Sequence, residues 1–148
     1  MRIADVGAFL LALALLSSTC GSLPSDCQRF FALPSERQEA EFQEYPLEKQ
    51  FDLYLCGMSM EPPDVGLGFY VAAGGEKNVP FLLQKLKTEK RENVQVQILI
   101  LFDFLAGQGH LKSRQDIFDQ LHAIVSAMKI APFKKQGEEQ LIRIKKNL

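Results

Sequence analysis

VPFLLQKLKTEKREN, the stretch at residues 79–93, joins an apolar helix face to a charged end. Leu82, Leu83 and Leu86 are spaced so that they share one face of an α-helix. Pro80 fits the first turn of such a helix, because the amide proton that proline lacks would have no partner there. Charged residues dominate from Lys85 onward. We therefore expect an amphipathic helix over residues 79–89 that ends in a solvent-exposed turn.

Three further segments share one spacing of apolar residues, at offsets 0, 4, 7, 8 and 11. This spacing places the apolar side chains in one stripe along a helix. Residues 94–102, VQVQILILF, are also rich in β-branched residues, so a strand is the minor alternative there. The three stripes are Leu47, Phe51, Tyr54, Leu55 and Met58; Val94, Ile98, Leu101, Phe102 and Leu105; and Ile117, Leu121, Ile124, Val125 and Met128.

Helix-breaking residues lie between these segments, with Pro62 and Pro63 after the first stripe and Gly74 and Gly75 further on. From residue 46 onward we expect six helices, over 46–58, 63–73, 79–89, 93–106, 113–129 and 136–147. Ser35 is expected to cap a further short helix. The prediction is an all-α domain over residues 35–148, after an N-terminal linker at 23–34. It is made of about three stacked helical hairpins, arranged as a short helical solenoid or as a helical bundle. Its expected core is Leu82, Leu83, Leu86, Ile98, Leu101, Phe102, Leu121, Ile124 and Val125.

Residues 79–109 resemble a HEAT-like α-helical repeat, and the flanking helix pairs resemble one more weakly. The first helix has a P-x-L-L-x-x-L pattern, a charged turn follows, and the second helix is aliphatic and ends in glycine. HEAT repeats usually carry an aspartate in the turn, where this chain has Glu92 and Asn93. They also carry a basic residue early in the second helix, where this chain has Gln95 and Gln97. The resemblance implies a short α-solenoid, for which about three units is the usual minimum.

The N-terminus, residues 1–22, has the pattern of a signal peptide. Residues 6–16, VGAFLLALALL, form an apolar run that is too short for a membrane-spanning helix, and small residues follow it. We expect export, to the periplasm or as a secreted product. The stretch LLSSTC also resembles an imperfect bacterial lipobox, which would acylate Cys20 and anchor the chain to a membrane surface. A soluble exported product is the preferred prediction, and the anchored form is the alternative.

The chain has three cysteines. Once Cys20 is removed or acylated, Cys27 and Cys56 remain as a pair. A disulfide between them would stabilise the fold by about 3–4 kcal/mol in the chain-entropy model. The alternative is that Cys56 is a buried thiol and Cys27 a free one.

Charge is nearly balanced, with 17 basic and 18 acidic side chains, which argues against a nucleic-acid partner. The distribution is uneven, since residues 36–64 are mainly acidic and residues 129–148 mainly basic. Lys85, Lys87, Lys90 and Arg91 cluster near the first turn described above. They are either a solvated helix face or a basic rim that contacts an acidic partner or anionic lipid headgroups.

No catalytic, cofactor-binding or metal-ligating motif occurs in the sequence. We therefore expect a non-enzymatic, exported helical scaffold that binds an unknown protein partner and needs no cofactor. The alternative is a small enzyme or an enzyme inhibitor. Its polar site would lie at the hairpin ends, around Glu61, Asp64, Gly107 and His110.

Overall fold

The computed structural model describes residues 23–148, which contain eight α-helices, one 3-10 helix and no strand. This confirms the all-α prediction and excludes the strand alternative for residues 94–102. The elements are α1 (Ser25–Phe31), α2 (Ser35–Glu44), α3 (Leu47–Met58), α4 (Leu67–Ala73), η1 (Gly75–Asn78), α5 (Val79–Thr88), α6 (Glu92–Gly107), α7 (Gln115–Ala127) and α8 (Ala131–Lys146).

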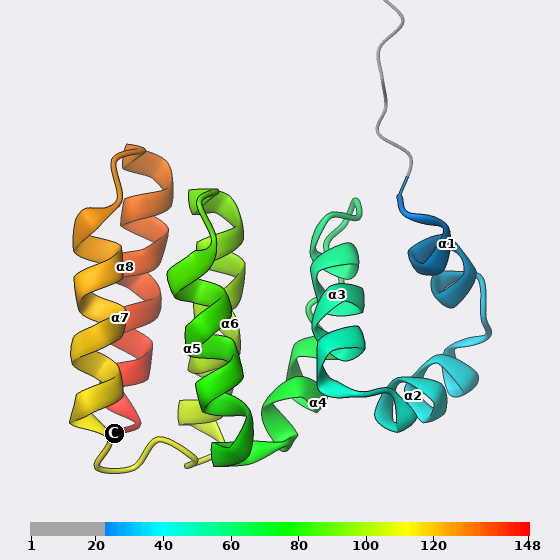
Figure 1. Ribbon diagram of the computed structural model, residues 1–148, viewed down its shortest axis with the longest axis horizontal. Coiled ribbons are helices and arrows are strands. Elements are labelled where there is room, and N and C mark those ends of the chain that lie inside the picture. The colour runs from blue at the N-terminus through cyan, green and yellow to red at the C-terminus, as the bar shows by residue number, and fades with distance from the viewer. Residues whose placement is uncertain (1–22) are drawn as a thin grey trace, which may run out of the picture.

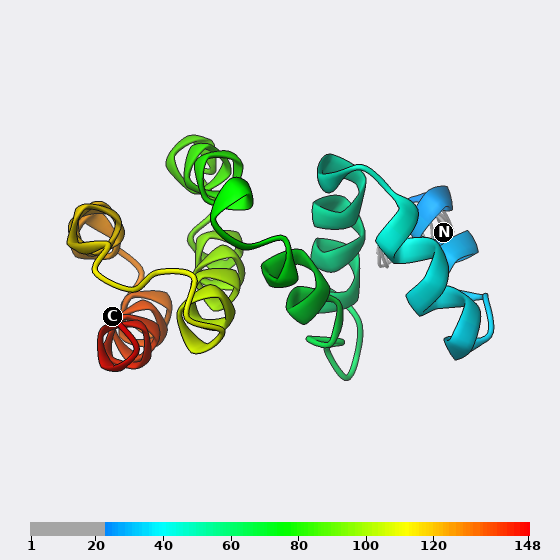
Figure 2. The same cartoon turned by 90° about the horizontal axis from the view of Figure 1, so that it is seen from below.

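The helices form a row, with the short helices α1 and α2 at one end and the antiparallel pair of α7 and α8 at the other (Figure 1). Viewed from below, α5 and α7 lie in one layer while α6 and α8 lie in the other (Figure 2). Helix α6 packs most extensively on α8 and on α4, so it joins the hairpins into one body. Within residues 23–148, no helix has both the length and the apolar character that crossing a membrane requires.

A continuous apolar core runs through this row of helices. Tyr54 and Phe102 are among its largest fully buried side chains, and the Tyr54 hydroxyl donates to the Gln97 carbonyl oxygen at 2.7 Å. Eight of the nine predicted core residues are buried, and Ile124 is partly buried. Each large aliphatic side chain buried in this way contributes about 1.5–3 kcal/mol relative to exposure. The helical periodicity therefore identified the core correctly.

A proline immediately precedes each of the first three helices. Pro24, Pro34 and Pro46 precede α1, α2 and α3 with ψ angles of 144°, 144° and 152°. Each proline carbonyl accepts a backbone hydrogen bond from the helix that follows. Ser35 is the first residue of α2 instead of its cap, and no side-chain hydrogen bond caps that helix. The prediction for Ser35 was wrong, because proline's fixed φ already sets the entry to the helix.

Residues 23–34, predicted to be a linker, contain α1. Cys27 and Phe30 of this helix are buried, and α1 packs on α3. A disulfide joins Cys27 to Cys56, with the two Cα atoms 6.1 Å apart. Tertiary packing therefore stabilises a seven-residue helix that would be marginal in isolation.

Two helix starts also differ from the prediction. Helix α4 begins at Leu67, because the preceding loop is held by Asp64, whose N–H donates to the Gly57 carbonyl and whose Oδ1 accepts from Gly66 N–H. Helix α8 begins at Ala131, five residues before the predicted start at 136. Pro132 lies in its first turn, a position that proline favours because its missing amide proton would have no partner there.

Candidate partner-binding surface

The predicted basic rim is divided between neighbouring helices. Lys85 Nζ lies 3.1 Å from Glu48 Oε1 of α3 and sits 5.5 and 5.2 Å from the ring centroids of Phe51 and Phe81. Lys87 Nζ instead donates to Gln120 Oε1 of α7 at 2.6 Å. These two lysines therefore contact helices on either side of α5 and help to hold the hairpins together.

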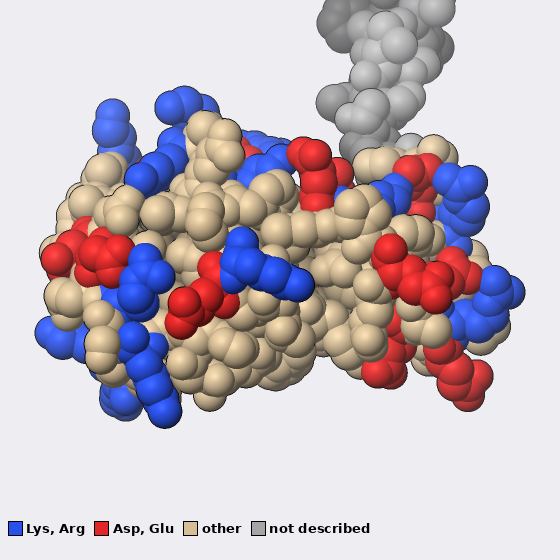
Figure 3. All heavy atoms as spheres, turned by 60° about the horizontal axis from the view of Figure 1, so that its bottom comes forward, with Lys and Arg blue, Asp and Glu red and all other residues tan. Residues whose placement is uncertain are grey.

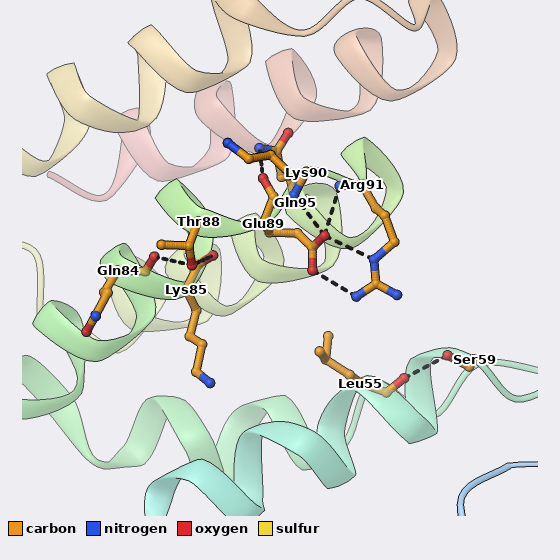
Figure 4. Close-up of polar contacts among 9 residues, drawn as sticks. All are labelled: Leu55, Ser59, Gln84, Lys85, Thr88, Glu89, Lys90, Arg91 and Gln95. Carbon is orange, nitrogen blue, oxygen red and sulfur yellow. Dashed lines mark hydrogen bonds and ion pairs between the residues drawn. The ribbon is translucent and has the colours of Figure 1, made fainter.

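Lys90 and Arg91 belong to the turn between α5 and α6, which Glu89 organises (Figure 4). Glu89 Oε1 accepts from the backbone N–H groups of Lys90 and Arg91, at 2.9 and 2.8 Å, and Oε2 pairs with Arg91 Nη2 at 2.8 Å. Chiefly because of the Arg91 side-chain hydrogen bond, the pKa of Glu89 falls from 4.5 to about 2. Figure 4 shows Lys85 extending toward α3 while Lys90 points away from it. Three of the four basic side chains, those of Lys85, Lys87 and Arg91, therefore have different partners.

The residues of the alternative polar site lie at opposite ends of the hairpins. Asp64 lies beside Gly57, near the end of α3, whereas His110 packs against Gly75, whose Cβ position would be 3.2 Å from the imidazole. The loop that follows α3 is at the top of Figure 1, whereas the C-terminal end of α6 and the loop that follows it are at the bottom. The structure therefore does not bring these four residues together.

Glu92 links two hairpins through backbone hydrogen bonds. Its Oε1 accepts from Lys129 N–H at 2.7 Å and its Oε2 accepts from Ile130 N–H at 2.8 Å. These amides immediately precede α8, where backbone donors lack partners within the helix. The carboxylate therefore ties the residues immediately before α8 to another hairpin.

Two of the four exposed large hydrophobic residues in the described part of the chain lie together. Val65 precedes α4 and Phe69 lies on it, with 43% and 52% of their surfaces exposed. The Phe69 ring stacks on Phe104 of α6, at a centroid distance of 4.1 Å and an interplanar angle of 21°. We call Val65, Phe69 and Phe104 the α4–α6 patch. The other two exposed residues, Ile130 and Ile142, belong to the α8 end of the row.

Gly68 allows α4 to approach α6 closely enough for this stacking. A Cβ atom at Gly68 would lie 2.7 Å from Cε2 of Phe104 and 3.1 Å from Cε2 of Tyr54. The sequence contained one signal for the patch, because α4, LGFYVAA, is apolar at nearly every position. A helix with one buried face does not need apolar residues all round. Periodicity alone did not show which of them would be exposed.

Charged side chains are distributed unevenly along the row of helices. Helix α2 carries four glutamates and one arginine, whereas α8 carries five basic and two acidic residues. On the face shown in Figure 3, acidic groups are most frequent toward the N-terminal helices at the right, where basic groups lie beside them, and basic groups are frequent toward the left end. The middle of this face is largely uncharged but carries a few charged groups. The molecule is therefore dipolar along its length.

Cys20 and the signal-peptide pattern lie outside the described residues. Comparison with protein-family models, curated proteins and solved structures finds no match to the chain. Function must therefore be argued from the geometry of residues 23–148 and from the sequence.

Proposed function

We propose that the protein is an exported helical scaffold whose α4–α6 patch binds a protein partner. The observation that carries this proposal is the exposure of Phe69, an aromatic side chain that is held in a fixed position on Phe104 yet remains 52% exposed. Aromatic side chains that present rigid apolar area at low entropic cost are frequent anchors of protein interfaces. Val65 extends the apolar area next to this anchor.

The repeated hairpins support a HEAT-like interpretation of the scaffold. Each helix pair buries only part of its apolar surface within itself, and α6 completes its burial against both α4 and α8. Glu92 adds a polar link from one hairpin to the next. An arrangement of this kind gives a partner an extended surface without requiring a catalytic pocket.

Export is part of the same proposal. The disulfide between Cys27 and Cys56 supports it, because such bonds persist mainly in oxidising compartments. Mass spectrometry of protein from the native host tests this directly. A mature start at Gly21 or Leu23 would indicate a secreted or periplasmic product, and an acylated Cys20 a membrane-anchored one. Retention of Met1 would overturn export.

The binding proposal is tested by affinity capture from the native envelope or medium, comparing Phe69→Ser with the control Ile142→Ser. Both positions are more than half exposed, so neither change should unfold the domain. A partner identified with the unmodified protein should then be titrated against both variants. We expect Phe69→Ser to weaken binding at least tenfold, as at an interface anchor, and Ile142→Ser to leave it unchanged. Equal affinity of the two variants would refute this surface.

A further inference from the structure

A cavity of about 470 Å³ lies between the α2–α3 connection and the α4–η1 segment. This volume is within the usual range for small-molecule sites. The lining is unusual, because carboxamide and tyrosine side chains dominate it. The residues that matter here are Gln43, Tyr45, Gln50, Tyr70, Lys77 and Asn78.

Asn78 is the one buried polar side chain in the described part of the chain, with 6% of its surface exposed. Its Nδ2 donates to the Val71 carbonyl oxygen at 2.7 Å, which fixes the orientation of the carboxamide. Gly74 makes this arrangement possible, since a Cβ atom there would lie 1.9 Å from Asn78 Nδ2. Oδ1 of Asn78 accepts no hydrogen bond from the described residues and remains available to a ligand.

Gln50 is held in a similar way. Its Nε2 donates to the Tyr45 carbonyl oxygen at 2.9 Å, so the side chain is tied to the α2–α3 connection and its Oε1 remains free to accept. Gln43 is exposed at the edge of the cavity and makes no hydrogen bond of its own within the described residues. The cavity therefore offers two carboxamides, those of Gln50 and Asn78, whose positions are set before any ligand arrives.

Two tyrosine rings complete the lining, and the core holds both in place. The Tyr70 ring lies 6.1 Å from the ring of Phe42, and the Tyr45 ring lies 6.4 Å from that of Phe30. Both tyrosines are partly buried, so each ring leaves some surface exposed. Rings fixed in this way can pack against an apolar ligand face at little entropic cost.

Charge around the cavity argues against an anionic ligand. Lys77 is the only charged residue that lines it. The Glu39 side chain on α2 raises the pKa of Tyr70, and α2 carries three more glutamates. The negative charge of these glutamates opposes the attraction that the Lys77 ammonium would exert on an anion. Lys77 is then most useful as a hydrogen-bond donor to a neutral group.

We propose that this cavity is a binding site for a neutral saccharide. Each sugar hydroxyl is both a donor and an acceptor, as is each carboxamide, so Gln43, Gln50 and Asn78 can each exchange hydrogen bonds with a sugar hydroxyl. The C–H face of a pyranose ring presents the apolar surface that the tyrosine rings cover. This site is separate from the α4–α6 patch and does not depend on partner binding there.

The test is titration of the full chain with neutral sugars, using glucose, galactose, mannose and N-acetylglucosamine, followed by NMR or calorimetry. We expect at least one of them to bind saturably with a Kd of about 1 mM, as suits a few hydrogen bonds in an open site. Binding should change little with added salt, because the ligand is neutral. Glucuronic acid should bind more weakly than glucose. Absence of saturable binding by all four neutral sugars, or tighter binding of glucuronic acid, would overturn the proposal.

Substitutions of cavity residues test whether the sugar binds in this cavity. Gln43→Ala and Lys77→Ala change exposed cavity residues and should leave the circular dichroism spectrum unchanged. Each should weaken sugar binding by about two- to twelvefold, the effect of one lost hydrogen bond. The matched controls Gln136→Ala and Lys135→Ala, exposed on α8, should have no effect. Full affinity in both cavity variants would overturn the assignment of the site.

Discussion

Replacing Glu92 should loosen the connection between the α5–α6 and α7–α8 hairpins. Glu92→Ala removes the acceptor for Lys129 N–H at 2.7 Å and for Ile130 N–H at 2.8 Å. Loss of an acceptor at a helix start costs about 0.5–2 kcal/mol. Lys129 and Ile130 are both exposed, so water can bind their amides once the carboxylate is removed. This reduces the cost even though two hydrogen bonds are lost. We expect the free energy of unfolding to fall by about 1–2 kcal/mol.

Glu92→Gln separates the role of charge from that of shape. The carboxamide keeps one acceptor oxygen, but neutral hydrogen bonds are about half as strong as charge-assisted ones. The expected loss is therefore about 0.5–1 kcal/mol, between wild type and Glu92→Ala. Glu139→Gln, at an exposed position on α8 that forms no ion pair within residues 23–148, is the matched control and should have no effect.

Urea unfolding measures these differences, and amide hydrogen exchange locates them. In Glu92→Ala, exchange should accelerate at Lys129 and Ile130 and at the start of α8, while the start of α5 should exchange as in wild type. The reasoning is refuted if Glu92→Ala is as stable as Glu139→Gln, or if exchange at the two amides does not change.

Three further changes probe other contacts. Gly74→Ala should displace Asn78, break its bond to the Val71 carbonyl and lower the thermal stability by about 1–3 kcal/mol; an unchanged melting temperature would contradict this. Replacing Cys27 and Cys56 together by Ser should lower the free energy of unfolding in urea by about 3–4 kcal/mol, and a loss below about 1 kcal/mol would contradict the chain-entropy estimate. Since the pKa of Glu89 is lowered from 4.5 to about 2, its contribution to stability should be complete above pH 4.5 and disappear as pH falls toward 2. Glu89→Gln should remove that part of the pH dependence, and an identical pH profile would contradict the assignment.

The sequence was sufficient to predict that six α-helices follow residue 46, and it gave good bounds for α3, α6 and α7, whose apolar stripes are long and regular. It was not sufficient for α1, whose seven residues carry no clear periodicity. That helix depends on Phe30 and Cys27, which are buried against a helix that follows much later in the chain. The start of α8 was missed although Pro132 in its first turn is a local signal for it. The contact of Glu92 on α6 with Lys129 and Ile130, just before α8, joins residues that are far apart in the sequence. A local sequence pattern does not show which residues from distant parts of the chain will contact a helix.

Candidate functional residues were harder to predict than the fold. Lys85 and Lys87 are neighbours in sequence, yet they contact Glu48 and Gln120 on different helices. The function of a charged side chain depends on such partners, which clustering in sequence does not reveal. The exposure of Phe69 could not be predicted either, because an apolar residue in an apolar helix is normally buried. Its exposure became evident only when α4 was placed beside α6.

The central claim, that the α4–α6 patch contacts a partner, is tested most directly by site-specific crosslinking in the native host. A photoreactive phenylalanine analogue at position 69 replaces a side chain that is already aromatic and 52% exposed, and the same analogue at position 142 is the control. The account predicts a discrete crosslink to another protein from position 69 and none from position 142. Absence of a crosslink at position 69, or the same products from both positions, would contradict it.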